Sequence, residues 1–208
     1  MLSGRPRQHG MSIVEVTIAI SLAAVLMAVA APSLVTGNQN RQVRNAAGAL
    51  QNGLTMARTE ALRRNRNVKF SLVSPQGSWS VGCETPDATV VNGEVSCPDV
   101  IRTRNSGDGS GLARIDLVEV VSTGASAGST AFSASGNLTF TPMGRVSTSG
   151  IAPTLGNGNT AVYAVSRPGG TCASAGGEIR CLEIHVTAAG QIRTCDPAVT
   201  HASDPRAC

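Results

Sequence analysis

Hydrophobic residues follow three different patterns along this 208-residue chain. The first is a run without any charge, Val16–Ala31, whose apolar character extends to Val35. Counted from Met11, the segment approaches the roughly 20 residues that an α-helix needs to cross the hydrocarbon of a bilayer. This pattern therefore predicts a membrane-spanning helix over residues 11–35.

In the second pattern, apolar residues recur in alternating steps of four and three, the spacing of a single helical face. The positions are Val43, Ala47, Leu50, Leu54, Ala57 and Ala61. Residues off this stripe include Arg41, Arg44, Gln51, Arg58 and Arg66. We expect residues 36–67 to continue the helix and to pack one face on a domain. The whole helix would have about 55 residues and a length of about 80 Å. Bends are expected at Pro32, Gly37, Gly48 and Gly53.

From Val68 onward the period becomes two, and turn-forming residues separate short apolar segments. The expected strands are VKFSLV, GSWSVGC, LARIDLVEVV, NLTFTPMGRVS, TAVYAVS and the two halves of RCLEIHVTAAGQIRTC. The last segment predicts a hairpin, Cys181–Val186 and Gln191–Cys195, around a turn at Ala188–Gly190. Strands and helices do not alternate, so we predict an α+β fold in which the long N-terminal helix packs on an antiparallel β domain of residues 68–208.

Cations flank the apolar run on one side. Arg5 and Arg7 precede it and none follows until Arg41, so the positive-inside rule keeps the N-terminus in the cytoplasm and exports the rest. This predicts a single-pass inner-membrane protein with a periplasmic or extracellular head.

A secretory signal peptide cut after Ala30 is an alternative, because AVA at residues 28–30 has the small-residue cleavage pattern. Glu15 would then lie inside the hydrophobic region, at a cost of about 2.5–3.5 kcal/mol. Pro32 would also follow the cut at a position that disfavours cleavage.

Gly10, Met11 and Glu15, followed by the apolar run, resemble the N-terminus of a type IV prepilin. The resemblance implies a leader of residues 1–10, cleavage between Gly10 and Met11 by a prepilin peptidase, and N-methylation of Met11. The apolar run would remain as the transmembrane and assembly helix. The family usually has Phe where this chain has Met11.

The stretch LTMARTEALRRNRNV, Leu54–Val68, resembles a signature of the GspH/FimT family, which contains minor pilins of type IV pili and a minor pseudopilin of type II secretion. The matching residues are Leu54, Ala57, Arg58, Glu60, Ala61, Arg63, Arg64, Asn65 and Val68. The resemblance implies a type IV pilin-like fold of one long helix and two small sheets. A plainer alternative is that residues 58–69 are a solvated basic face, whose cations suit the C-terminal end of a helix.

Six cysteines follow residue 80, and their even number in an exported chain predicts disulfides. They are Cys83, Cys97, Cys172, Cys181, Cys195 and Cys208. Pairing of neighbours in sequence is the simplest arrangement, but Cys181 and Cys195 flank the expected hairpin and could pair with each other instead. The spacing leaves the connectivity open.

No catalytic motif is recognisable, so we do not expect an enzyme or a cofactor. Neither His185 nor His201 completes a zinc-finger spacing with the cysteines, so no metal site is expected. NSGDGSG at residues 105–111 has a single carboxylate and predicts a turn rather than a calcium loop.

DNA is a candidate partner, because some FimT-type proteins bind it through a C-terminal G-R-x-R motif and a further arginine. Here the matching text is GQIR, residues 190–193, and the candidate contacts are Arg180, Arg193 and Arg206. Loss of the leader leaves 15 cations and 13 acids, a net charge of +2, which predicts weak binding to phosphates. These arginines are alternatively rim residues of an interface between pilins.

Three functional hypotheses follow from these resemblances. The first is a minor pilin that inserts into or primes a type IV pilus, with other pilins as partners. The second is a minor pseudopilin of a type II secretion machine, and the third is a DNA-binding subunit of a pilus. In each, Glu15 would pair with the freed amino group of a neighbour's Met11 and set the register between subunits.

Overall fold

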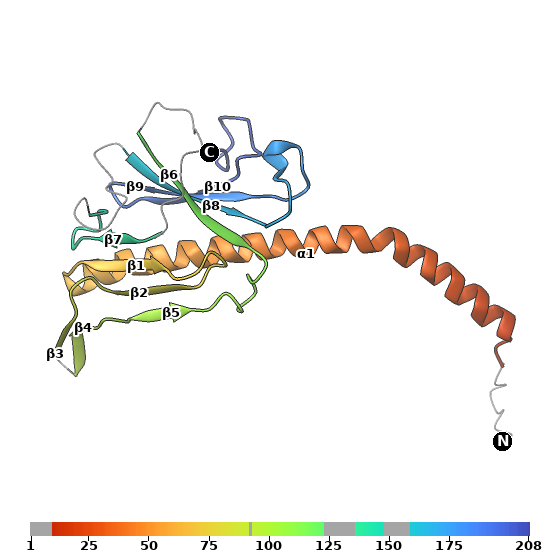
Figure 1. Ribbon diagram of the computed structural model, residues 1–208, viewed down its shortest axis with the longest axis horizontal. Coiled ribbons are helices and arrows are strands. Elements are labelled where there is room, and N and C mark those ends of the chain that lie inside the picture. Colours follow the sequence, from red (N-terminus) through yellow and green to blue (C-terminus); the bar gives the residue numbers. More distant parts are fainter. Residues whose placement is uncertain (1–9, 92, 123–135, 148–158) are drawn as a thin grey trace, which may run out of the picture. The chain divides into compact units, whose positions relative to one another are not determined.

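The computed structural model describes residues 10–91, 93–122, 136–147 and 159–208. The chain forms two compact units, Met1–Asn38 and Gln39–Cys208, and we call the second unit the head. Helix α1, Ile13–Arg64, has 52 residues and contributes to both (Figure 1). The leader residues Arg5 and Arg7 lie outside the described part of the chain.

Within the described residues, the β part of the head consists of two four-stranded antiparallel sheets and one two-stranded hairpin. The first sheet has the order β5-β2-β1-β7, from Arg102–Arg104, Trp79–Cys83, Val68–Leu72 and Leu138–Phe140. The second has the order β10-β9-β8-β6, from Ile192–Cys195, Leu182–Thr187, Asn159–Ser166 and Arg114–Ser122. The hairpin pairs β3, Asp87–Val91, with β4, Glu94–Cys97. A short 3₁₀ helix, η1, covers Ala173–Ala175.

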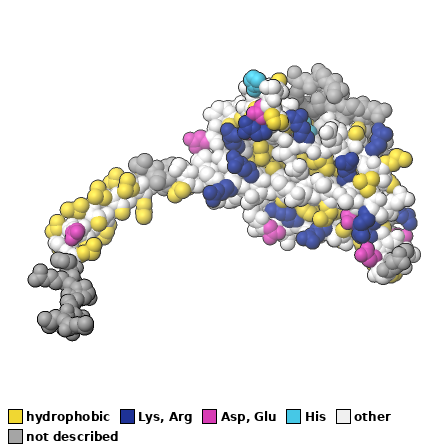
Figure 2. Space-filling model, turned by 180° about the vertical axis from the view of Figure 1, so that it is seen from behind, with side chains coloured by type: hydrophobic (Ala, Val, Ile, Leu, Met, Phe, Trp, Pro, Cys, Tyr) yellow, Lys and Arg dark blue, Asp and Glu magenta, His cyan; other side chains and the backbone are white. Residues whose placement is uncertain are grey.

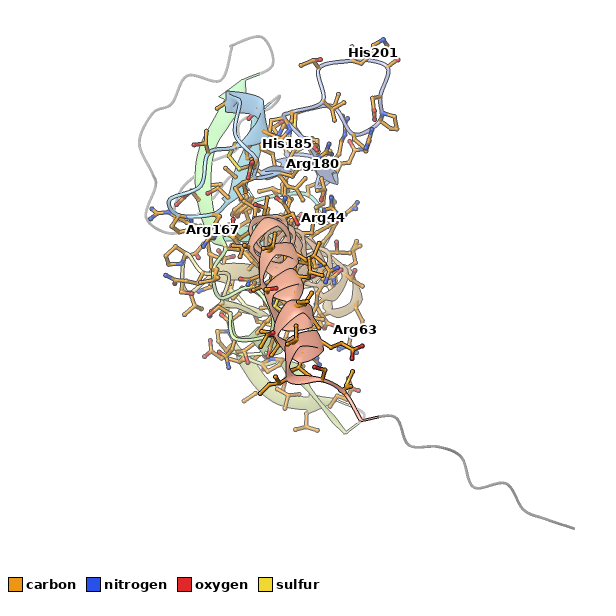
Figure 3. All side chains as sticks on the ribbon, turned by 90° about the vertical axis from the view of Figure 1, so that its right-hand side faces the viewer. Arg44, Arg63, Arg167, Arg180, His185 and His201 are labelled. Carbon is orange, nitrogen blue, oxygen red and sulfur yellow. A yellow bond between two sulfur atoms is a disulfide. The ribbon has the colours of Figure 1, made fainter. Side chains whose placement is uncertain are left out.

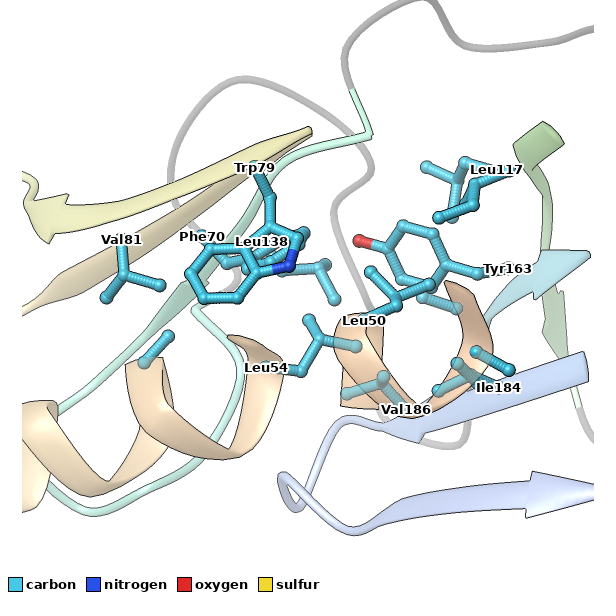
Figure 4. Close-up of a cluster of buried hydrophobic side chains, with 14 of the residues drawn as sticks. Leu50, Leu54, Phe70, Trp79, Val81, Leu117, Leu138, Tyr163, Ile184 and Val186 are labelled. Atoms are coloured by element: carbon cyan, nitrogen blue, oxygen red, sulfur yellow. The ribbon is translucent and has the colours of Figure 1, made fainter. Parts of the chain in front are cut away.

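The apolar stripe of α1 forms the centre of the head's core. All six predicted stripe positions are buried, as is Ala46, so the predicted packing face is confirmed. Leu50 and Leu54 point between the two sheets in Figure 4, towards aromatic residues on both sides. The core on one side includes Phe70 and Trp79 of the first sheet, and on the other side Tyr163 of the second.

Gly53 allows α1 to approach the first sheet closely. A Cβ atom at this position would lie 2.8 Å from Phe70 Cε2 and 2.9 Å from Trp79 Cε2, well inside van der Waals contact. The rings of Phe70 and Trp79 pack against each other with centroids 6.0 Å apart. The structure thus gives Gly53 a role in close packing, and a bend at this residue stays a prediction.

Three disulfides connect cysteines that are neighbours in sequence: Cys83–Cys97, Cys172–Cys181 and Cys195–Cys208. The alternative bridge between Cys181 and Cys195 is not formed. Cys83 and Cys97 join the end of β2 to the end of β4, and both are buried in the core. The Cys83–Cys97 disulfide therefore fastens the β3–β4 hairpin to the first sheet from within the core.

The strands agree with the predicted segments, with one exception between Cys83 and Arg114. The hairpin β3–β4 and the short strand β5 lie there, and their sequences did not stand out as strands. Two conditions of this segment explain the difference. The strands are short, and the side chains Val90, Val95 and Val100 are exposed, so no alternation between core and solvent marks them.

Candidate functional site

Large hydrophobic side chains cover the helix of the first unit and face solvent in the single chain (Figure 2). The exposed fractions are 81% for Ile13, 70% for Leu26 and 71% for Leu34. Met11 is 76% exposed at the start of this segment. An exposed apolar surface of this kind marks a region that is covered in the protein's working environment.

Glu15 lies in the first turn of α1, the only ionisable group of this described helix before Arg41. Figure 2 shows one acidic side chain among the hydrophobic ones. The neighbouring polar residues are satisfied internally, because Thr17 Oγ1 donates to the Val14 carbonyl and Ser21 Oγ to the Ile18 carbonyl, each at 2.8 Å. Glu15 differs from Thr17 and Ser21, because an ionised carboxylate only accepts hydrogen bonds and cannot donate to a carbonyl of its own helix.

The side chains of α1 are described in two parts, one on each side of residues 29–32. Neither part alone is long and apolar enough to cross a bilayer. Ile13–Ala28 and Ser33–Arg64 together pass that test, by length and composition. Pro32 falls in the interval between them, where side chains are not described, and a kink there stays a prediction.

Arg58 of the family-like signature connects α1 to two loops of the head. Its Nε donates a hydrogen bond to the Gly144 carbonyl at 3.1 Å. Gly144 in turn contacts Gly190, the first residue of GQIR. The contact is so close that a Cβ atom on Gly190 would overlap the carbonyl oxygen of Gly144. Arg58 is thus half-buried and engaged, and the plainer interpretation of a solvated basic face is wrong at this position.

Glu60 organises the other charged residues of the signature. Its Oε2 accepts from Arg64 Nε at 2.8 Å and from Arg63 Nη2 at 3.0 Å. Burial acts to raise the pKa of Glu60, but the hydrogen bonds from Arg63 and Arg64 outweigh it and hold this pKa below its ordinary value. Arg64 also donates to the carbonyls of Val95 and Ser96, which fastens the β3–β4 hairpin to the helix end.

Asn65 ends the helix. Its φ of 52° is left-handed, and the Arg66 amide donates to the Ala61 carbonyl, which together form a Schellman-type C-cap. The chain then enters β1 with Val68 buried. The signature therefore encodes how the long helix stops and how three head segments attach to it.

The three candidate DNA contacts are each engaged inside the chain. Arg180 Nη1 pairs with Asp196 at 3.2 Å, and Arg206 Nη2 pairs with Asp204 at 2.7 Å. Arg193 donates to the carbonyls of Pro205 and Ala207. Hydrogen bonds from Arg206 lower the pKa of Asp204 to about 2. The C-terminal arginines therefore hold the last residues of the chain in place.

A pocket of about 270 Å³ brings two of these arginines beside the helix. Its lining includes Arg44 from α1 with Arg180 and Arg206, and one buried carboxylate, Asp196. Arg44 and Arg180 lie on the same side of the head in Figure 3. The pocket thus combines three guanidinium groups with one acid, and two of the three, Arg180 and Arg206, are already paired with Asp196 and Asp204. Arg44 was not among the sequence candidates, because it lies about 140 residues from Arg180 in the chain.

Sequence spacing also missed a cluster on β9 and β10. His185 Nε2 lies 2.9 Å from Glu183 Oε2 and 3.5 Å from Cys195 Sγ. The register of the hairpin places Cys195 opposite Glu183, and no linear motif spans that distance. The detectable signal was the alternation of Glu183 and His185 on one face of the predicted strand.

The family described as Type II transport protein GspH matches residues 46–190 of the chain. The prokaryotic N-terminal methylation motif matches residues 5–31. Two solved structures of the type IV minor pilin FimU from Pseudomonas aeruginosa are also similar. The first has 17% identity and a TM-score of 0.41 over 73% of this chain and 86% of that chain, and the second has 18% and 0.39 over 73% and 90%. No curated protein matches the sequence.

Proposed function

Because the chain belongs to the family of the type II transport protein GspH and carries the N-terminal methylation motif, we propose that it is a minor pilin that takes part in type IV pilus assembly. One observation carries the proposal. In the described residues, the helix of the first unit exposes large apolar side chains such as Ile13, Leu26 and Leu34, whereas the stripe of α1 that belongs to the head is buried. Such a helix needs either lipid or the helices of other subunits to cover it.

The proposed pathway begins at the inner membrane, with residues 1–10 in the cytoplasm and the head in the periplasm. Prepilin peptidase cuts between Gly10 and Met11, and Met11 becomes the N-methylated amino terminus. The subunit then leaves the bilayer for a pilus, where it belongs to a priming or tip complex, and Pro32 kinks the helix in this setting.

Glu15 sets the axial position of the subunit in this proposal. Its carboxylate pairs with the freed amino group of a neighbour's Met11 inside a bundle of apolar helices. A buried pair of this kind adds little net stability, but stranding one of its charges costs about 3–5 kcal/mol. Pairing therefore selects one register of neighbouring subunits over others.

The test compares Glu15→Ala with Glu84→Ala, which removes an acid from the head instead. Sheared pili and membranes are separated, and the amount of this chain in each is measured by immunoblotting. We expect Glu15→Ala to be cleaved normally but to reach pili at about a tenth of the normal level or less. Normal incorporation of Glu15→Ala would remove the register role. A mature N-terminus at Ala31 rather than Met11 would overturn the whole proposal.

A minor pseudopilin of a type II secretion machine is the second candidate, favoured by the description of the matching family itself. The two candidates predict different partners for the detergent-solubilised chain. Cross-linking at position 15 should capture pilus subunits in the first case and secretion pseudopilins in the second. Deletion would correspondingly reduce piliation or reduce the export of folded enzymes.

DNA binding is the third candidate, and the intramolecular contacts of its arginines count against it. Releasing Arg180, Arg193 and Arg206 to phosphates would break two ion pairs and two carbonyl contacts. We expect only weak, salt-sensitive binding. A titration of duplex DNA at several salt concentrations tests this, with the double variant Arg193→Ala, Arg206→Ala. Unchanged affinity in that variant would remove these two residues from a DNA site.

A further inference from the structure

Four side chains that ligate metals meet on one face of the β9–β10 hairpin. Glu183, His185, Cys195 and Cys208 each offer one ligand atom, and these atoms all lie within 4.8 Å of one another. Glu183 and His185 are two residues apart on β9 and therefore share a face, and Cys195 is paired opposite Glu183. Three of the four groups are thus fixed by strand pairing.

Cys208 reaches the cluster through contacts that do not depend on its disulfide. The Asp196 amide donates to the Arg206 carbonyl at 2.7 Å, which closes the C-terminal segment into a loop. Arg193 binds the carbonyls of Pro205 and Ala207, on either side of that contact. The terminal residue therefore stays close to β10 when the bond between the sulfurs is broken.

The cluster has two chemical states, since Cys195 and Cys208 form a disulfide. A dithiol reductant adds two electrons and two protons and breaks the bond between the sulfurs. The two thiols lose their protons on binding a metal and become thiolates. Two thiolates, one imidazole and one carboxylate form a four-ligand set of the atom types that bind Zn²⁺, with no position left open.

We propose that Glu183, His185, Cys195 and Cys208 form a Zn²⁺ site that is present in the dithiol state and closed by the Cys195–Cys208 disulfide. Oxidation by a disulfide partner withdraws two electrons, rejoins the sulfurs and releases the ion. The site would hold the C-terminal segment in its native place before the last disulfide forms. This inference does not depend on the pilus or secretion role of the chain.

The other two disulfides supply an internal comparison. Within the described residues, neither Cys83–Cys97 nor Cys172–Cys181 belongs to a cluster with His or carboxylate ligands. Cys208 is exposed, whereas Cys83 and Cys97 are buried. Limited reduction should therefore open the Cys195–Cys208 bond before the Cys83–Cys97 bond.

The experiment titrates Co²⁺ into the full chain in detergent micelles, with and without a limiting amount of a phosphine reductant. Thiols freed by the reductant are mapped by alkylation and mass spectrometry. We expect the reduced chain to bind one Co²⁺ with thiolate charge-transfer absorption and tetrahedral d–d bands, and Zn²⁺ to displace it. The oxidised chain should show neither absorption. His185→Gln should weaken binding at least tenfold, while His201→Gln should leave it unchanged.

A second route avoids the reductant and keeps the other two disulfides intact. Cys208→His removes the bridge, frees the Cys195 thiol and supplies an imidazole as the fourth ligand. We expect this variant to bind Co²⁺ without reduction, and Cys208→His combined with Cys195→Ser to lose the thiolate absorption. Absence of binding both in the reduced chain and in Cys208→His would overturn the proposal. Equal binding in the oxidised chain, or in reduced Cys195→Ser, would also overturn it.

Discussion

The two parts of helix α1 have opposite relations to the rest of the chain. In the described residues between Ile13 and Asn38 its large hydrophobic side chains face outwards, whereas from Gln39 to Arg64 the apolar stripe is buried in the head. The backbone of the helix is continuous, so the difference between the two parts comes from their side chains. The first part is predominantly apolar, with Glu15 as its one charged residue, while the second has one narrow apolar face of small and branched residues.

This contrast separates folding from assembly. The head contains its own core, three disulfides and the helix cap, so its stability is determined within the chain. The first part of α1 adds apolar surface that has no partner within the described chain. Substitutions in the two parts should therefore report on different processes, stability in one and association in the other.

The largest expected effect follows from truncating the stripe. Leu54→Ala leaves a cavity in the fully buried core and should lower the free energy of unfolding by about 2–5 kcal/mol. Leu22→Ala, in the exposed part, should change the same quantity by less than about 0.5 kcal/mol. Urea denaturation in micelles, followed by the fluorescence of Trp79, measures both. Equal losses would break the contrast between the two parts.

Removing the Cys83–Cys97 disulfide measures how much this bond contributes to the stability of the head. Cys83→Ser with Cys97→Ser releases a loop with a sequence separation of 14 and should cost about 3 kcal/mol. The same urea titration measures the loss. Alkylation beforehand verifies that the other four cysteines remain paired. Incorporation into pili should fall only as far as the unfolded fraction rises, and a larger fall would show that the disulfide also serves assembly.

Arg58→Ala should have a smaller effect. It leaves the Gly144 carbonyl without its guanidinium donor and should lower the free energy of unfolding by about 1–3 kcal/mol. Arg41→Ala removes an exposed arginine of the same helix and serves as the matched control. If both variants lost the same amount, charge on the helix would matter rather than the contact with Gly144.

The smallest effect concerns the exposed pair of Asp204 and Arg206. In the folded chain Arg206 lowers the pKa of Asp204 from 3.8 to about 2. A depressed carboxyl pKa stabilises the fold above the unfolded value, and this contribution disappears as the pH falls from about 4 to about 2. A carbon-detected NMR titration measures the pKa directly. Arg206→Ala should return it towards 3.8, and an unchanged value would assign the shift to the backbone amide instead.

Much of the fold could be predicted, because apolar residues repeat with a helical period in α1 and with a period of two in the strands. The steps of four and three from Val43 to Ala61 identified the buried face of α1, and alternation identified strands such as β1 and β9. Gly53 was harder, because a helical glycine can mark either a bend or a close contact. Its role depends on Phe70 and Trp79, which the helix meets only after the head has folded.

The residues of the candidate site also differ in whether their role depends on nearby residues in the sequence or on distant ones. Met11 and Glu15 could be recognised from the sequence, because they lie close together at one end of the helix. Arg44 and Arg180 meet across the fold, and His185 meets Cys195 across a strand pair, so linear spacing contains no sign of either. The arginines at 193 and 206 were visible as candidates, but their partners, two carbonyls and Asp204, depend on how the C-terminal segment closes.

The contact between Gly144 and Gly190 has a consequence for how this chain can vary. Gly190 has a φ of 79°, and a Cβ atom there would overlap the Gly144 carbonyl oxygen at 1.9 Å. Gly144, at a φ of 72°, receives Arg58 on the same oxygen. In a library of all single substitutions, both positions should therefore accept glycine alone, while Gln191 next to them tolerates exchange. A designer who wished to place a new sequence on the GQIR hairpin would have to begin at its second residue.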